Sequence, residues 1–322
     1  MTRNFGLPLI LTAVLAACTG GSGSLGTLPP AETAQPSVVL GSPDVTPDTS
    51  PDASPSAPAG SAAPSNGPSA SPAGTTIVRA YFFLAGPQGS AWIVPVLREI
   101  PATTGVAKAA MIALLAGPNG KEGAATPKIS TTIPAGTQLL GLSIDNGVAT
   151  VDLSREFESG GGSASVLGRL GQVVYTLTQF PSVKSVLFEV EGREVHAFGG
   201  EGAVLDGPVG RSDYEYVLPN IFVDRPAWGA ALGNPGRVSG NANVFEATFR
   251  ITLLDGNGKQ LVDQQAMATC GSGCEPRGTF DVTIRYDVPK AQYGTLRVWD
   301  GSAKDGSPQD VREYPVWLTP AN

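Results

Sequence analysis

The chain has 322 residues, which is enough for two domains of ordinary size. Its net charge of −7 argues against a non-specific nucleic-acid-binding protein, because such proteins need a basic surface. With one histidine and three cysteines the chain is poor in ligands for zinc or haem, so we expect neither a metal nor another cofactor.

Residues 1–17 have the features of a bacterial secretion signal. Arg3 supplies a short positive segment, and residues 5–17 are apolar but too few to span a bilayer. The segment ends in Leu-Ala-Ala-Cys, which resembles a lipobox. The resemblance implies cleavage before Cys18 and lipidation of that cysteine, and several acyl chains would anchor the protein stably. The alternative is a plain secretion signal followed by an incidental cysteine.

Residues 18–74 comprise this cysteine and a linker of low complexity. Residues 19–74 are nearly all Ser, Thr, Pro, Ala and Gly, with no Lys or Arg. Such a segment cannot bury enough apolar surface to offset the entropy lost on ordering. We therefore predict a disordered spacer whose r.m.s. reach is on the order of 40 Å.

The first folded region begins with two predicted strands, at residues 76–84 and 92–100, joined by a Gly-Pro-Gln-Gly turn. Thr104 is placed to cap a helix that runs to Ala116, because apolar residues recur there at helical spacing. Gly117-Pro118 then ends the helix, and a long loop follows.

A hairpin is predicted around Asn146-Gly147, because both residues tolerate the positive φ angles of a tight turn. In its second strand Ala149, Val151 and Leu153 share one face. These elements and those that follow have one apolar face each, which they can bury only against one another. The predicted fold is an α/β sandwich, a sheet with helices packed on it.

A second helix is predicted where apolar residues recur at spacings of three and four from Val166 to Phe180. Ser163 or Ser165 is placed to cap its start, and Pro181 to stop it. Residues 183–190 then form a strand, which Glu191-Gly192 turns back on itself. The order ββα, ββα, ββ suggests a weak internal duplication.

Two stretches carry a resemblance to a known family. G-x-A-x-V-D-L-S-R-E-F at residues 147–157 and Q-V-V-Y-T-L-T-Q-F-P-S-V at residues 172–183 resemble the GerMN domain of sporulation and spore-germination proteins. The stretch L-L-A-G-P at residues 114–118 belongs to the same match. The resemblance implies a GerMN-like domain over residues 75–215.

Asp152, Arg155 and Glu156 cluster at the end of a predicted strand and are a candidate binding surface. Two carboxylates beside a cleft can perform acid–base chemistry, but a solvated strand end, with Arg155 paired to a neighbour, is the simpler interpretation. His196 lacks a Ser or Cys nucleophile motif, so a structural or surface role is simpler. The glycines at 160–162 either cradle an anion or form a mobile loop.

The second folded region reads as strands without helices, and Phe245 to Leu253 alternate with polar residues as in a half-buried strand. Asp255-Gly-Asn-Gly is a hairpin turn. About seven short strands indicate an antiparallel sandwich. They are predicted at residues 221–223, 236–242, 244–254, 260–268, 279–287, 294–299 and 311–318.

N-A-N-V-F-E-A-T-F at residues 241–249 and W-D-G-S-A-K-D-G-S at residues 299–307 resemble the Gmad-type immunoglobulin-like domain of spore germination. The resemblance implies an all-β domain over residues 219–322. It departs from the family in the insert C-G-S-G-C. In an exported protein Cys270 and Cys274 are expected to form a disulfide that closes a Gly-rich loop.

Three tryptophans of this region are candidates for a binding surface. Trp299 and Trp317 lie in predicted strands and are expected in the core, whereas Trp228 is expected to plug the space between the domains. Four oxygen-bearing turn residues could also bind calcium, but their spacing is not that of an EF-hand, and turn formation explains them more simply. They are Asp255, Asn257, Asp300 and Asp305.

The sequence thus predicts a lipoprotein anchored on the extracytoplasmic face of the cell membrane, with a non-enzymatic binding or scaffolding role linked to sporulation or germination. Expected partners are the membrane, envelope proteins or peptidoglycan, and a second copy of the chain, but no nucleic acid. One alternative is a peptidoglycan-acting enzyme that uses Asp152 and Glu156. Another is a glycan or small-ligand receptor with its site between the domains.

Overall fold

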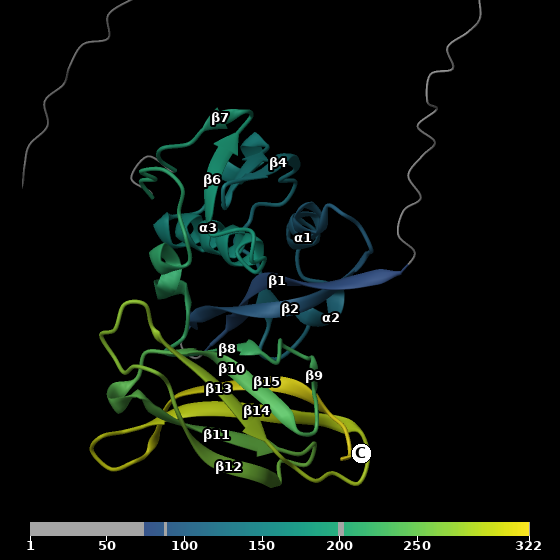
Figure 1. Cartoon of the computed structure of the whole chain (residues 1–322), viewed down its shortest axis with the longest axis vertical. Coiled ribbons are helices and arrows are strands. Elements are labelled where there is room, and N and C mark those ends of the chain that lie inside the picture. The colour runs from purple at the N-terminus through teal and green to yellow at the C-terminus, as the bar shows by residue number, and fades with distance from the viewer. Residues whose placement is uncertain (1–73, 87–88, 199–202, 322) are drawn as a thin grey trace, which may run out of the picture. The chain divides into compact units, whose positions relative to one another are not determined.

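The computed structural model describes residues 74–86, 89–198 and 203–321 (Figure 1). The predicted signal peptide, Cys18 and nearly all of the linker lie outside these residues. Within the described ranges, no helix combines the length and the apolar composition needed to cross a membrane.

The α/β region, which we define as β1 to the 3₁₀ turn η3 (Ser212–Val217), contains two sheets. In the first sheet β1 (Thr75–Ala85) pairs along its whole length with β2 (Ala91–Pro101), and with the two-residue β3 (Ile129–Ser130) on its other edge. The second sheet has four strands, of which only β5 and β6 are parallel. They are β4 (Leu139–Asp145), β5 (Val148–Leu153), β6 (Ser185–Val190) and β7 (Arg193–Glu194).

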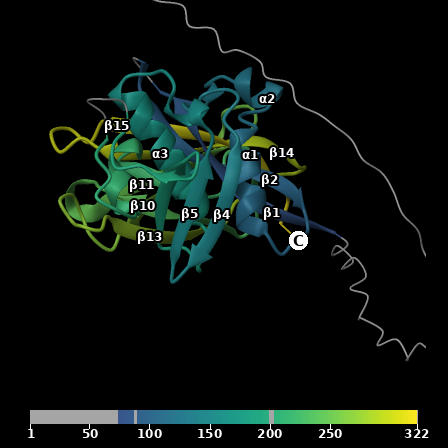
Figure 2. The same ribbon diagram turned by 90° about the horizontal axis from the view of Figure 1, so that it is seen from above.

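The helices α1 (Val106–Leu115) and α3 (Ser163–Leu177) lie between these two sheets (Figures 1 and 2). α1 packs against β1, β2 and β4, and α3 packs against β1 and β6. The sequence predicted one sheet with helices on it, so the division into two sheets corrects that detail. Because α3 is covered on both sides, its residues are buried almost continuously from Val166 to Leu177.

The open edge of β1 is completed by side chains of α3 and of the residues that directly follow it. Gln172 Nε2 donates to the carbonyl of Tyr81 (2.8 Å), and the Tyr81 N–H donates to Thr176 Oγ1 (3.2 Å). Gln179 binds both backbone groups of Arg79, donating to the carbonyl (2.7 Å) and accepting from the N–H (2.8 Å). Buried backbone groups need partners, so these side chains replace a neighbouring strand along this edge.

The hairpin turn is confirmed, with Asn146 and Gly147 at φ angles of 48° and 87°. The predicted helix caps are wrong. α1 follows Gly105 rather than Thr104, and α3 follows Gly162 without a side-chain cap from either serine. α3 also ends at Leu177, well before Pro181.

The predicted long loop after α1 contains the short helix α2 (Gly120–Gly123), whose first turn is fixed by a capping box between Asn119 and Glu122. Glu122 also forms a two-bond ion pair with Arg98, at 2.7 and 2.6 Å. Both side chains are largely buried. This charge pair holds the loop against β2.

The β-sandwich region, from β8 to β15, has a three-stranded and a five-stranded sheet. The rings of Phe249 and Phe280 meet between them, with centroids 4.8 Å apart. The prediction of an α/β domain followed by an immunoglobulin-like sandwich is confirmed. The smaller sheet holds β13 (Gly278–Ile284), β10 (Gly236–Ala242) and β8 (Ile221–Arg225), and the larger holds β12 (Gln260–Met267), β11 (Thr248–Leu254), β14 (Gln292–Gly301), β15 (Pro308–Leu318) and β9 (Ala231–Leu232).

The predicted strand 244–254 begins only at Thr248. Residues Phe245–Ala247 form a 3₁₀ turn in which Glu246 and Ala247 have φ angles of 54° and 59°. Phe245, expected on the buried face, is 63% exposed. The turn interrupts the strand alternation, so the side-chain direction inferred for Phe245 does not hold, whereas Ala247 is buried as expected.

The α/β and β-sandwich regions belong to one compact unit and share a hydrophobic core. Tyr175 of α3 meets Phe222 of β8, with ring centroids 6.1 Å apart. The hydroxyl of Tyr81 donates to Asp224 at 2.6 Å. The backbone N–H of Trp228 donates to the carbonyl of Pro95 at 2.9 Å, so the segment that connects the regions is hydrogen-bonded to β2.

Candidate functional site

The residues proposed from the sequence at the end of β5 tie two turns together. Asp152 Oδ1 accepts a hydrogen bond from the Gly192 N–H (2.9 Å), and the Arg155 N–H donates to Glu191 Oε1 (3.0 Å). Both contacts fix the β6–β7 turn against the end of β5. The contact of Arg155 is made by its backbone N–H, and within the described ranges no ion pair of its guanidinium is found.

A cavity of about 650 Å³ opens beside this strand end. Asp152 and Glu156 do not line it; its lining consists of Arg155, Glu158, residues 190–191 and residues 193–197, which include His196. Hydrogen bonding, chiefly from Ser154, lowers the pKa of Glu156, whereas a general acid needs a raised one. The structure thus does not bring the two carboxylates of the enzymatic alternative together in one cavity.

The glycine-rich loop before α3 is held by a buried arginine. Arg169 donates to the carbonyls of Phe157, Ser159 and Gly160, at 2.5, 3.1 and 2.7 Å. Burial lowers the pKa of this guanidinium. Because several loop carbonyls converge on a cation, the loop is organised around Arg169 and not around an anion.

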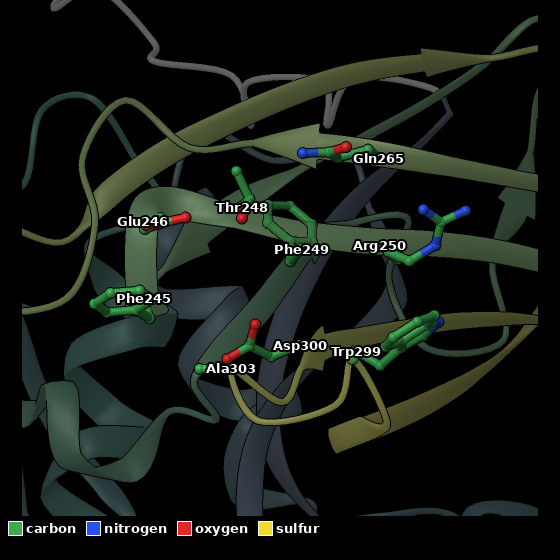
Figure 3. A pocket seen from close by; sticks show the side chains of 11 residues that line it. Phe245, Glu246, Thr248, Phe249, Arg250, Gln265, Trp299, Asp300 and Ala303 are labelled. Carbon is green, nitrogen blue, oxygen red and sulfur yellow. The ribbon is translucent and has the colours of Figure 1, made fainter.

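A second cavity, of about 420 Å³, lies on the larger sheet of the β-sandwich region, and we call it the sandwich cavity. Figure 3 shows Phe245 and Trp299 at its two ends, with Asp300 between them. Aromatic, acidic, basic and amide side chains all line it. They include Phe245, Glu246, Arg250, Gln265, Trp299 and Asp300.

Trp299 is fixed in the sandwich cavity by its neighbours. Its Nε1 donates to Thr252 Oγ1 (3.2 Å), and the guanidinium of Arg250 lies 5.6 Å from the ring centroid. Arg250 is in turn paired with Asp263 at 2.7 Å. The ring is thus a rigid aromatic wall, an arrangement that favours stacking of a flat ligand face.

The two acidic side chains of the cavity are available to a ligand. Within the described ranges neither Glu246 nor Asp300 forms an ion pair. Burial raises the pKa of Asp300. A backbone hydrogen bond from Gly301 opposes this rise, and the charge of Asp310 adds to it. Carboxylates beside aromatic walls can accept hydrogen bonds from ligand hydroxyl or ammonium groups.

The sequence reasoning placed Trp299 and Trp317 in the core, and this is wrong. Trp299 is half-buried, and Trp317 is 36% exposed. Alternation along β14 contains the missing signal, because Leu296 and Val298 are buried and residue 299 must then face outward. The exposure of Phe245 depends on the 3₁₀ turn at Phe245–Ala247, and no sequence pattern predicts that turn.

The remaining predicted residues have structural surroundings. Cys270 and Cys274 are joined by a disulfide. Trp228 is partly buried between the two regions, beside Val96. Asp255 and Asp305 accept hydrogen bonds within their own turns, and no group of three potential metal ligands occurs in the described part of the chain.

Three solved structures are similar to parts of the chain. A candidate lipoprotein from Clostridium perfringens is 22% identical, with 47% of this chain and 95% of that chain covered and a TM-score of 0.31. The first GerMN domain of the sporulation protein GerM from Bacillus subtilis is 22% identical, with coverages of 42% and 99% and a TM-score of 0.35. The tandem GerMN domains of that protein are 19% identical, with coverages of 59% and 60% and a TM-score of 0.35.

None of the curated proteins matches the chain. Residues 79–196 match the Germane family, described as sporulation and spore germination. Residues 220–307 match the Gmad2 family, described as the immunoglobulin-like domain of bacterial spore germination. Both resemblances predicted from the sequence are thereby confirmed, and the chain carries a sporulation and spore-germination domain of the Germane family followed by an immunoglobulin-like Gmad2 domain.

Proposed function

We propose that this chain is a lipid-anchored envelope protein with a binding role, displayed on the extracytoplasmic face of the cell membrane. The lipobox-like sequence ending at Cys18 supports the anchor. The linker that follows is long enough to carry the folded part towards the cell wall. The descriptions of the two matched families support a link to sporulation or germination.

The sandwich cavity is the observation that supports this role, and its chemistry suits a wall glycan. The face of a sugar ring is apolar enough to stack on Trp299, while its hydroxyls can donate to Glu246 and Asp300. The ring of Trp299 is already oriented by Thr252 and Arg250, so little side-chain freedom is lost on binding. We therefore assign peptidoglycan as the ligand.

The test is co-sedimentation of the full chain with purified peptidoglycan. Trp299→Ala removes the stacking wall and is expected to weaken binding about tenfold or more, as loss of an aromatic anchor does at other interfaces. Trp317→Ala is the matched control, because Trp317 lies on the same sheet outside the cavity. Equal binding by both variants would contradict the proposal.

Two further measurements distinguish the alternatives: release of wall fragments by the purified chain, and cross-linking in cells. Release of soluble wall fragments, abolished by Glu156→Gln, would favour the enzymatic alternative instead. Cross-linking of the full chain in cells reports on the proposed partners: capture of defined envelope proteins indicates an adaptor, and capture of a second copy indicates self-association. Capture of wall material alone agrees with the proposed binding role.

A further inference from the structure

A third cavity, of about 450 Å³, lies where the two regions meet, and we call it the junction cavity. β2 contributes Trp92, η3 contributes Glu215, and β15 contributes Asp310 and Arg312. Arg277, which directly precedes β13, completes the charged lining. The cavity is separate from the sandwich cavity.

Arg277 is a buried cation without a counter-ion. The residue is only 7% exposed, and its Nη2 donates to the carbonyls of Pro219 and Asn220, both at 2.6 Å. No ion pair is found for it among the described residues, and its Nε is buried without a hydrogen-bond partner. Burial lowers the pKa of the guanidinium, and the charge of the nearby Glu215 opposes this in part.

Arg312 lines the same cavity in a similar state. Its guanidinium lies 5.2 Å from the centroid of the Trp92 ring, and its Nη1 donates to the Val311 carbonyl (2.7 Å). Arg312 Nε and Trp92 Nε1 are both buried without a partner. Two guanidinium side chains and the Trp92 side chain thus line one cavity.

Some arginines elsewhere in the described ranges are paired differently. Four of them form ion pairs with a carboxylate: Arg98, Arg237, Arg250 and Arg297. In the junction cavity Glu215 and Asp310 also carry carboxylates, yet neither forms an ion pair within the described ranges. Asp310 instead accepts a hydrogen bond from the amide of Asn220 (2.6 Å). The two guanidiniums therefore lack direct charge partners although carboxylates lie near.

We propose that the junction cavity binds an oxyanion, a phosphate or carboxylate group of an envelope molecule, between Arg277 and Arg312. Guanidinium groups bind both kinds of oxyanion through charge-assisted hydrogen bonds. Trp92 adds a flat aromatic wall. The bound group would replace the missing counter-charge, and because its site is built from both regions it would also hold them together.

The test measures the unfolding temperature of the full chain in phosphate, in acetate and in chloride at equal ionic strength. A ligand at ten times its Kd is expected to raise Tm by about 3 °C relative to chloride. A rise in phosphate alone indicates a phosphate-bearing ligand, and a rise in acetate alone a carboxylate. The absence of a rise in both would overturn the proposal.

Two variants separate binding from stability. Because Arg277 also clamps the connecting chain, we change Arg312: Arg312→Gln is expected to abolish the rise, whereas Arg297→Gln, an exposed ion-paired arginine on the neighbouring strand, keeps it. Asp310→Asn removes a competing anion, and Asn tolerates the φ of 51° at this position. That variant is expected to bind phosphate or acetate more tightly. If the cavity binds neither anion, the change in Tm between chloride and phosphate or acetate will be the same in all three variants, and this would contradict the proposal.

Discussion

Asp300, near the end of β14, and Asp305, in the β14–β15 turn, lie in different electrostatic environments. Burial raises the pKa of Asp300, whereas hydrogen bonds from Ser307 lower that of Asp305. A raised pKa means that folding favours the protonated carboxyl, so the stability it contributes is present at low pH and is lost as pH rises through the folded-state pKa. For Asp305, whose pKa is lowered, the contributed stability is instead present at neutral pH and is lost as pH falls through the folded-state pKa.

We therefore expect Asp300→Asn to be more stable than the unmodified chain at pH 7, and the difference to disappear near pH 3. The gain should be below about 1 kcal/mol, because much of the carboxyl stays in contact with water. Thermal unfolding at both pH values measures it. Asp305→Asn is the control and is expected to lose stability at pH 7, so a loss in both variants would contradict the assignment for Asp300.

The docking of α3 on β1 depends on single polar side chains within a buried helix. Gln172 is fully buried and has partners for both ends of its amide, since its Oε1 also accepts from Thr131 and Thr132. We expect Gln172→Ala to lower the free energy of unfolding by about 3 kcal/mol, because it leaves buried backbone groups of Tyr81 and Thr132 unpaired.

Urea unfolding of the full chain measures this effect. Gln260→Ala, an exposed glutamine on β12, is the control and should change the stability by less than about 0.5 kcal/mol. If the two variants cost the same, water or a local shift compensates for the lost amide, and the edge of β1 does not depend on Gln172.

Elements with a strong local signal could be predicted from the sequence. The β4–β5 hairpin follows from Asn-Gly between apolar runs, and the body of α3 follows from its apolar spacing. β3 and α2 are too short to show a period. Gln172 gives no signal either, because a glutamine in a helix is normally read as solvent-facing, and its role depends on a strand 91 residues away.

The candidate site was predicted only in part, for a reason that belongs to the whole molecule. Asp152 and Arg155 were correctly placed at a strand end, but the sandwich and junction cavities gather residues from several strands. Trp92 and Arg312 are 220 positions apart in sequence and meet only because the two regions pack together. No local pattern encodes that contact.

Because the two regions share one core, we expect the described part of the chain to unfold in a single cooperative transition. Trp228 is the side chain on which this coupling can be tested, since it packs between the regions. Trp228→Ala is expected to cost about 2 kcal/mol, which corresponds to a fall in Tm of roughly 4–8 °C. Its backbone bond to Pro95 is kept in the variant.

Calorimetry of the full chain gives both quantities. Trp317→Ala is the matched control, because Trp317 meets Tyr293 edge-to-face within the β-sandwich region and its loss should lower Tm less. If Trp228 couples the regions, its loss broadens or splits the transition, whereas loss of Trp317 only shifts it. Two separate transitions in the unmodified chain would contradict the shared core, and would mean that a ligand of the junction cavity has to bring the regions together on binding.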